Sequence, residues 1–198
     1  MRHIAMVYDT VSGSTADMGA IIRDVLRQGS TVTTLSVNAN ESLEPYDAVI
    51  IGSPMRFGWC TSKIRAFLKR HDALLARKKV AFFFSMLYVV RIAEEPADEG
   101  RLFFDPGLAI ATIPKKAATG MDKTHSLGFF QRRCCHNAPN IDPVSIAYFK
   151  GRLVLERLPF FERLFMKMVT TFTKKEQRGE FLNPVAVRGW AEALASRL

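Results

Sequence analysis

Residues 9–15 read Asp9-Thr10-Val11-Ser12-Gly13-Ser14-Thr15 and separate two patterns of different period. The apolar run from Ile4 to Tyr8 precedes them and predicts a buried strand. A strand-to-helix turn presents unpaired backbone amides at the positive end of a helix dipole, where anions bind. The stretch therefore predicts a phosphate-binding loop, because the apolar residues that follow it have helical spacing: Met18, Ile21, Ile22, Val25 and Leu26.

The composition of this loop narrows the choice of ligand. Hydroxyls at Thr10, Ser12, Ser14 and Thr15 add hydrogen-bond donors, and the loop contains no lysine or arginine. A triphosphate-binding P-loop needs Gly-Lys-Ser/Thr at its helix end, and a dinucleotide fold has Gly-x-Gly-x-x-Gly, but neither spacing occurs here. The loop therefore favours one terminal phosphate, held by hydroxyls and amides. The alternative is a turn rich in Ser and Thr that only caps the helix.

The length and composition favour one domain spanning residues 1–198. Of the 198 residues, 48% are hydrophobic, and no linker rich in Gly, Ser or Pro divides them. The longest apolar run, Val80 to Val90, is much shorter than the roughly 20 residues of a membrane-spanning helix. Asp9 interrupts any signal-like segment at the amino end, so we expect a cytoplasmic protein.

The three cysteines predict neither a disulfide framework nor a metal centre. Their number is odd, and no Cys-x-x-Cys spacing occurs. The run Cys134-Cys135-His136 lacks the distant second pair of ligands that would complete a tetrahedral site. Cys60 lies near a predicted helix start, where a thiolate could act as a redox partner, although packing is the simpler interpretation.

Strand and helix patterns alternate along the chain. A helix after the third strand has a buried stripe at Ile64, Phe67, Leu68, His71 and Leu75, and the last helix has Asn183 as its cap and Pro184 in its first turn. This alternation predicts an α/β fold, a doubly wound five-stranded parallel sheet with helices on both faces and ligands beyond the carboxyl ends of the strands. The five predicted strands are Ile4–Tyr8, Thr31–Val37, Ala48–Gly52, Val80–Ser85 and Ser145–Phe149.

A second loop follows the third predicted strand and reads Gly52-Ser53-Pro54-Met55-Arg56-Phe57-Gly58-Trp59. Its glycines and proline predict a turn that leads directly into a helix. Backbone amides in such a loop can reach the edge of a heteroaromatic ring, while an aromatic or methionine side chain packs on its face. The loop therefore favours a flat ligand. The alternative is that Phe57 and Trp59 only cover the core.

Together the two loops resemble the flavodoxin family. Residues 8–15 are similar to its phosphate loop for flavin mononucleotide (FMN), and residues 46–58 are similar to the strand and flavin-edge loop of its quinone-reductase branch. The sequence departs from the family pattern at Met6, Val11 and Gly19. The resemblance implies a flavodoxin-like fold with noncovalent FMN. It also implies that the flavin carries the electrons, so no catalytic residue is predicted.

The resemblance places three loops around FMN. The third loop, which follows the fourth predicted strand, is included because in flavodoxin-like proteins the loop at this position touches the flavin. The implied cofactor-binding residues are Thr10, Val11, Ser12, Gly13, Ser14, Thr15, Pro54, Met55, Arg56, Phe57, Gly58, Ser85, Met86, Leu87 and Tyr88.

Within the family, the chain is most similar to the menaquinone-dependent protoporphyrinogen oxidase branch, which acts in heme biosynthesis. The strand Tyr46–Gly52, the loop Arg56–Gly58 and the late segment Phe160–Met168 carry this resemblance. It implies an FMN-dependent oxidoreductase with a quinone as electron acceptor and porphyrinogen as substrate. Residues 92–121, inserted after the fourth strand, lie outside the resemblance. They predict either a lid that shapes a substrate pocket or a surface insertion.

The net charge helps to distinguish an enzyme from an electron carrier. The chain has 28 basic and 19 acidic residues, a net charge of +9. Flavodoxins that shuttle electrons are generally acidic, so the charge favours two-electron chemistry with an acceptor. Residues 150–178 contain eight basic and three acidic residues with apolar residues at helical spacing. They predict a basic amphipathic helix after strand five, which would either contact the inner face of the cell membrane or pack on the protein's own sheet.

Other functions remain open at this point. The closest enzyme alternative is an NAD(P)H:quinone reductase. From other classes come a flavodoxin-type electron carrier and a flavin-free interaction module, the latter because of the departures at Val11 and Gly19. Nucleic acid binding is not predicted, because the sequence has no helix-turn-helix, zinc-finger or aromatic RNA-binding signature. The sequence predicts no oligomeric state.

Overall fold

The central sheet is parallel and has six strands among the described residues. The structure is a computed structural model that describes residues 1–39, 41–56, 58–93, 100–108, 110–153 and 179–198. The strands follow the order β2-β1-β3-β4-β8-β6, and all of their pairings are parallel. Their bounds are β1 Arg2–Tyr8, β2 Ser30–Ser36, β3 Ala48–Pro54, β4 Lys79–Met86, β6 Leu102–Phe104 and β8 Pro143–Lys150. The five predicted strands are thereby confirmed within two residues at each end.

The sixth strand, β6, corrects the prediction of a five-stranded sheet. It comes from the inserted segment, whose sequence shows no periodicity, and it extends the sheet by pairing with β8, from Leu102 opposite Ile146 to Phe104 opposite Tyr148. Three residues are too few to show a period of two. Its existence depends instead on the edge of β8, whose backbone groups need partners.

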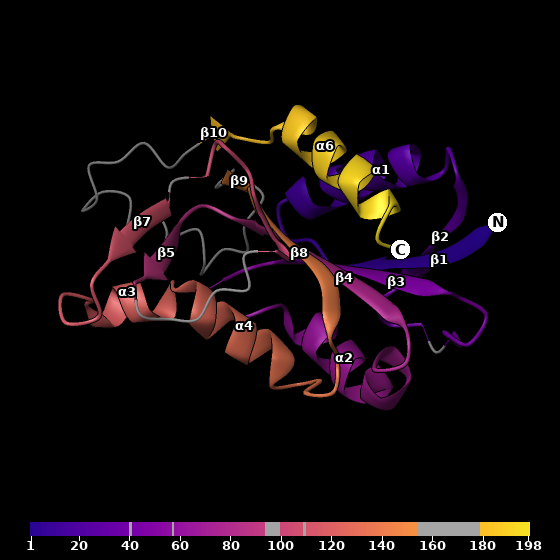
Figure 1. Cartoon of the computed structure of the whole chain (residues 1–198), viewed down its shortest axis with the longest axis horizontal. Helices are drawn as coiled ribbons and strands as arrows, with labels where there is room; N and C mark the ends of the chain where they lie inside the picture. The colour runs from indigo at the N-terminus through magenta and orange to yellow at the C-terminus, as the bar shows by residue number, and fades with distance from the viewer. Residues whose placement is uncertain (40, 57, 94–99, 109, 154–178) are drawn as a thin grey trace.

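Four of the described helices cover the two faces of the sheet. Helices α1 (Ser14–Leu26) and α6 (Pro184–Ala195) lie on one face, and α2 (Ser62–Leu75) and α4 (Leu127–Cys135) lie on the other (Figure 1). Successive strand residues point to opposite faces, so Ile50 packs with α1 and α6 while Ile51 packs with α2 and α4. Because helices cover both faces, the central strands read as continuous apolar runs.

The last helix is formed as its sequence predicts. The Asn183 side chain accepts a hydrogen bond from the Ala186 amide, and Pro184 occupies the first turn. The residues α6 buries are Ala186, Val187, Trp190, Ala191 and Leu194.

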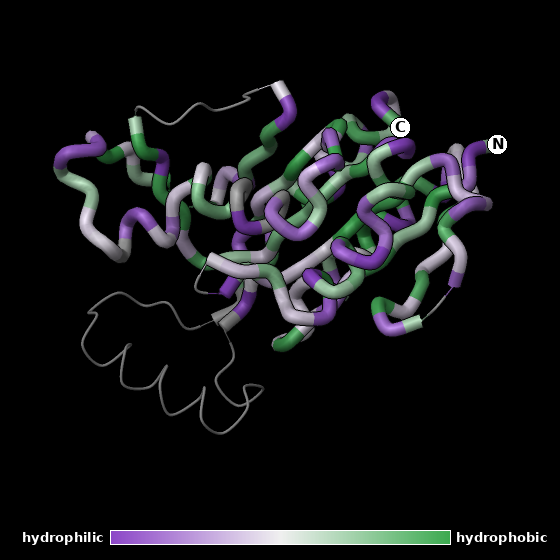
Figure 2. The backbone as a smooth tube through the Cα atoms, turned by 90° about the horizontal axis from the view of Figure 1, so that it is seen from below, coloured by the Kyte–Doolittle hydropathy of each residue, from purple (hydrophilic) through white to green (hydrophobic). Residues whose placement is uncertain are grey.

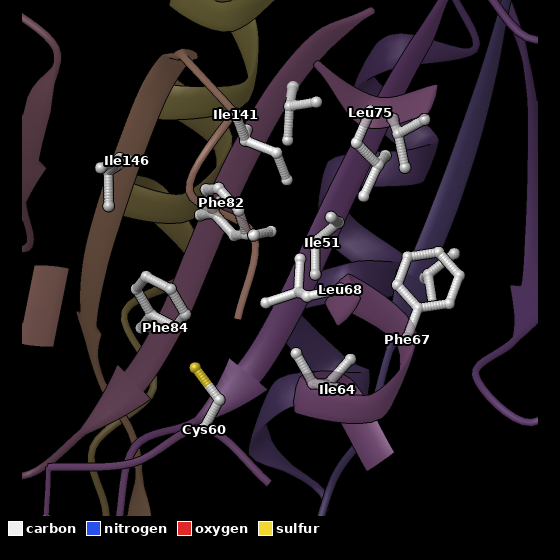
Figure 3. Close-up of a cluster of buried hydrophobic side chains, with 14 of the residues drawn as sticks. Ile51, Cys60, Ile64, Phe67, Leu68, Leu75, Phe82, Phe84, Ile141 and Ile146 are labelled. Atoms are coloured by element: carbon white, nitrogen blue, oxygen red, sulfur yellow. The ribbon is translucent and has the colours of Figure 1, made fainter. Parts of the chain in front are cut away.

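The core between the sheet and α2 includes Cys60, which lies at the border of the cluster in Figure 3. The Cys60 side chain is 4% exposed, and its Sγ lies 3.8 Å from Met55 Sδ. Figure 3 shows the thiol directed into the same cluster as Phe84 and Ile64. Cys60 therefore packs as a small apolar residue, and the structure gives no support to a redox role.

Part of the segment between β4 and β8 forms a small unit beside the central sheet. It contains β5 (Val89–Ile92), which pairs in parallel with β7 (Ile110–Ile113), and the short helix α3 (Gly120–Thr124) before α4. In Figure 1 this unit lies at the end of the molecule away from both termini. The described part of residues 92–121 thus belongs largely to this unit and to β6.

A two-stranded antiparallel ribbon follows β8. It joins β9 (Arg152–Leu153) to β10 (Gly179–Glu180). Residues 154–178 lie outside the described residues, so the amphipathic helix expected over 150–178 stays a prediction. In Figure 2, hydrophobic and hydrophilic stretches alternate along the whole coloured backbone tube. No helix in the described ranges is long and apolar enough to span a membrane.

Candidate functional site

Three loops meet at the carboxyl ends of β1, β3 and β4. The strand register places Tyr8 beside Gly52 and Pro54 beside Ser85. Backbone hydrogen bonds continue past the strands, from Asp9 N to Gly52 O at 3.2 Å and from Met55 N to Ser85 O at 2.9 Å. The three sequence segments predicted to bind one cofactor are thus brought to the same edge of the sheet, where ligands bind in doubly wound folds.

The first loop ends at an α1 terminus that has no side-chain cap. Gly13 is the N-cap residue, with φ of 93°, a left-handed conformation that favours glycine. A glycine has no side-chain oxygen to accept hydrogen bonds from the first-turn amides, which a capping Ser, Thr, Asp or Asn would provide. These amides and the helix dipole therefore form an anion-binding position immediately after the loop.

The four hydroxyls of this loop are already hydrogen-bonded within the chain. Thr10 Oγ1 accepts from the Gly13 amide at 3.0 Å, and Ser12 Oγ donates to the Arg152 carbonyl at 3.2 Å. Thr15 Oγ1 lies 3.0 Å from Ser85 Oγ, and Ser14 Oγ lies 3.5 Å from the same atom. Their expected role as donors to a phosphate stays a prediction. The first-turn amides are a second set of donors beside them, and the hydrogen bonds of the hydroxyls fix the shape of the loop.

The second loop is a tight turn that packs against α3 and α4. Arg56 and Trp59 exchange two backbone hydrogen bonds of 2.9 Å, and Gly58 between them has φ of 80°. A Cβ on Gly58 would lie 2.3 Å from a ring carbon of Phe129, so only glycine fits against this helix. Phe57, one of the side chains expected either to pack on the face of a flat ligand or to cover the core, lies outside the described residues.

Trp59 is held by two arginines. The Arg133 guanidinium lies 3.8 Å from the Trp59 ring centroid, and that of Arg65 lies 4.9 Å from it. Such contacts are attractive because the ring face carries negative charge density. Arg133 comes from α4, so this helix forms a wall beside the second loop. No local pattern in the sequence predicts this contact, since Trp59 and Arg133 are more than 70 residues apart.

The third loop is half buried. Ser85 and Met86 are covered, whereas Leu87 and Tyr88 are partly exposed. The Tyr88 ring lies 6.1 Å from the ring of His125, which lies just before α4. Partial burial, followed by the Asp122 carboxylate, raises the pKa of Tyr88 above its ordinary 10.0. Of the predicted residues in this loop, Leu87 and Tyr88 are therefore the ones open to a ligand.

One departure from the family pattern has a packing explanation. A Cβ on Gly19 would lie 3.0 Å from the ring of Tyr8, closer than ordinary van der Waals contact. The glycine makes room for this ring, which packs partly buried beside the first loop. The change at Gly19 is therefore explained by the packing of the Tyr8 ring.

Two hollows of the described surface lie outside the three loops, and one of them, of about 380 Å³, is lined by Val37, Asn38, Ser62, Lys63, Ala66 and Arg70. The other, of about 440 Å³, lies at the opposite, amino-terminal edge of the strands and is lined by Met1, Arg2, Asp47, Arg77, Lys79 and Leu198. Its arginine and lysine side chains donate hydrogen bonds to backbone carbonyls and to the Glu44 carboxylate. Within the described ranges, His, Cys, Asp and Glu residues form no group of three or more that could hold a metal ion.

Comparisons with known proteins agree with this geometry. Residues 5–179 match the family model of the flavodoxin domain. The two-electron reduced flavodoxin of Megasphaera elsdenii is 14% identical, and the similarity covers 98% of this chain and 98% of that chain with a TM-score of 0.50. No protein of curated function matches the sequence.

Two other solved structures are matched over a smaller share of their length. A mutant Fusobacterium nucleatum flavodoxin bound to flavin mononucleotide is 21% identical over 43% of this chain and 51% of that chain, with a TM-score of 0.35. Rubredoxin oxygen:oxidoreductase from Desulfovibrio gigas is 14% identical over 100% of this chain and 37% of that chain, with a TM-score of 0.50. The chain thus spans about half of the first and 37% of the second. The fold predicted from the two loops is confirmed.

Proposed function

This chain belongs to the flavodoxin family, and we propose that it is an FMN-dependent oxidoreductase with a quinone as its electron acceptor. The first-turn amides of α1 would hold the phosphate, the Arg56–Trp59 turn would meet the edge of the ring, and Leu87 and Tyr88 would border it. FMN, when bound, accepts and releases electrons. The residues of this chain bind and orient it.

The observation that carries this proposal is the uncapped amino end of α1. Gly13 leaves the first-turn amides without a side-chain acceptor, at the edge of the sheet where the two other loops converge. Helix caps most often have Ser, Thr, Asp or Asn at this position, whose side chain accepts from the first-turn amides. Thr10 and Ser12 instead fix the loop and leave the amides to a ligand.

The insertion after β4 favours an enzyme over an electron carrier. An electron carrier needs an open ring edge for its partner protein, whereas α3 and α4 place Phe129 and Arg133 against the second loop. Such a wall limits access of bulk water and gives a small organic substrate a surface to bind. The net charge of +9 would attract an anionic substrate. Protoporphyrinogen, which carries propionates, is our leading candidate substrate.

FMN binding is the first test. Flavin fluorescence titration of the purified chain should show saturable quenching by one FMN per chain. Gly13→Ala, which strains the left-handed cap, should bind FMN about tenfold more weakly or worse. Gly29→Ala is the matched control, because no atom lies within 4 Å of the added methyl group. A wild-type chain that neither binds nor retains FMN would contradict the proposal.

Turnover assays then separate the activities. Oxidation of protoporphyrinogen with a quinone as acceptor is the expected activity. Turnover of NAD(P)H with quinone, without porphyrinogen oxidation, would favour the quinone reductase. Arg56→Glu should lower the reduction potential of the bound flavin, because it replaces a cation near the ring with an anion. An unchanged potential would show that Arg56 does not act on the ring.

One observation favours a second candidate, the flavin-free interaction module. Ser12 Oγ donates to the Arg152 carbonyl and Ser14 Oγ to Ser85 Oγ, so a phosphate that needed these two hydroxyl protons would have to break those hydrogen bonds. A colourless protein that gains no flavin spectrum after incubation with FMN would support this alternative. An electron carrier would instead bind FMN, exchange electrons rapidly with a partner protein and turn over neither substrate.

We also propose a peripheral membrane contact through residues 150–178, where a membrane-dissolved quinone would be found. The support is the basic and apolar composition of that segment. Co-sedimentation with vesicles containing anionic lipid at low salt should pull down the chain, and added salt should release it. Absence of co-sedimentation at low salt would exclude the contact.

A further inference from the structure

The first loop contains no cation of its own, but an arginine from a distant segment of the chain lies beside it. The loop itself contains no lysine or arginine, yet Arg152, in β9, lies against it. The Arg152 carbonyl accepts a hydrogen bond from Ser12 Oγ at 3.2 Å, and its Nη2 lies 2.9 Å from Asp17 Oδ2. The arginine therefore contacts both the loop and the first turns of α1, the helix whose amino end has no side-chain cap.

The backbone just before Arg152 runs close to the first and third loops. The Gly151 amide donates to the Met86 carbonyl at 2.8 Å, and a Cβ on Gly151 would lie 3.4 Å from Ser14 Oγ. A side chain at this position would be in tight contact with Ser14 and Ser85. The Arg152 side chain is 10% exposed, so its charge acts where water screens it weakly. A solvated surface arginine would be much more exposed and far less effective.

We propose that Arg152 binds the phosphate of FMN and gives the site its preference for FMN over riboflavin. This inference rests on the proposed function. A phosphate monoester carries close to two negative charges at neutral pH, and amides alone provide only partial charges. Arg152 provides the full positive charge within a site that is partly closed to water. Asp17 competes with the phosphate for the same guanidinium.

The test compares the dissociation constants of FMN and riboflavin by flavin fluorescence. Arg152→Gln should weaken FMN binding on the order of tenfold, as expected for loss of a charge-assisted hydrogen bond, and leave riboflavin binding within about twofold. The dependence of FMN affinity on salt concentration should also become weaker. Arg77→Gln is the matched control, because Arg77 forms an exposed ion pair with Glu44. It should change neither constant.

A second pair of variants separates a ligand role from a structural one. If Arg152 served only as the ion-pair partner of Asp17, Asp17→Asn and Arg152→Gln would have the same effect. The proposal predicts opposite effects: Asp17→Asn should strengthen FMN binding, and it should no longer do so when Arg152→Gln is also present. Riboflavin binding serves throughout as the check that each variant is folded.

The outcomes distinguish this inference from the proposed function. A wild-type chain that binds FMN, with an Arg152→Gln variant that keeps the preference over riboflavin, would overturn the role of Arg152 alone. Equal loss of FMN and riboflavin affinity would show a structural role and also overturn it. A wild-type chain that binds neither flavin would overturn both proposals.

Discussion

At the scale of single residues, Gly58 connects the second loop to the inserted unit. Its φ is 80°, and a Cβ added there would lie 2.8 Å from the Thr124 carbonyl oxygen, so the position has room for hydrogen alone. Gly58→Ala should lower the free energy of unfolding by about 2 kcal/mol or more, because it combines backbone strain with overpacking. Urea denaturation measures this change. Gly189→Ala, in the middle of α6 with open space around it, should instead stabilise by about 0.5 kcal/mol.

His71 lies on α2 at the border between core and solvent. Partial burial, followed by the nearby Arg70 charge, lowers the pKa of His71 below its ordinary 6.5, and Arg70 Nε donates to its Nε2 at 3.2 Å. The unfolded state therefore binds the proton more readily, and this group destabilises the fold as the pH falls from about 6.5 through the lowered pKa. The melting temperature of wild type should fall between pH 7.5 and 5.5 by more than that of His71→Gln. Parallel losses would contradict this.

At the scale of elements, Asp105 joins the insertion to the last helix. Its carboxylate is 1% exposed and accepts from the Gly107 and Lys150 amides and from Asn183 Nδ2, at 2.8, 3.1 and 3.0 Å. Asp105→Ala leaves these donors without an acceptor and should destabilise the protein by about 3 kcal/mol. Chemical denaturation should show that Asp105→Asn lowers the free energy of unfolding by less than Asp105→Ala does. Equal stability of Asp105→Ala and wild type would exclude this connection.

The contact between α4 and the second loop can be followed through tryptophan fluorescence. The chain has two tryptophans, and Trp190 is 2% exposed with its indole hydrogen-bonded to Ser145, so changes at α4 should affect Trp59. Arg133→Gln removes the cation 3.8 Å from the Trp59 ring. It should shift the emission of Trp59 and destabilise by about 1 kcal/mol. An unchanged spectrum would mean that the stack is not maintained in solution.

At the scale of the whole molecule, the proposed cofactor should stabilise the fold. Three loops from different parts of the chain would contact one ligand that the unfolded state does not bind. FMN at about 100 times its dissociation constant should add about 2.7 kcal/mol to the free energy of unfolding. Differential scanning calorimetry should show a melting temperature that rises with FMN concentration. A transition that stays fixed over the titration would contradict binding to the folded state.

The sequence alone determined the five longer strands, the last helix and the two loops, because each depends on residues close together in the chain. Apolar runs, helical spacing and the Asn183-Pro184 cap signal are local. The strand ends at Pro54 and Met86 differ from the predicted ends by only one or two residues, since strand ends depend on the neighbouring strand.

Only the tertiary structure decided β6, the partners of the loop hydroxyls and the positions of Arg133 and Arg152. Apart from the local bond of Thr10, each of these depends on groups that lie far apart in the chain and meet because the sheet brings them together. The sequence does not indicate whether the Thr15 hydroxyl contacts a phosphate or Ser85, because the same residue type serves for both contacts. Local patterns indicate which elements form, because backbone geometry is local, whereas the occupants of a site follow from packing between distant segments.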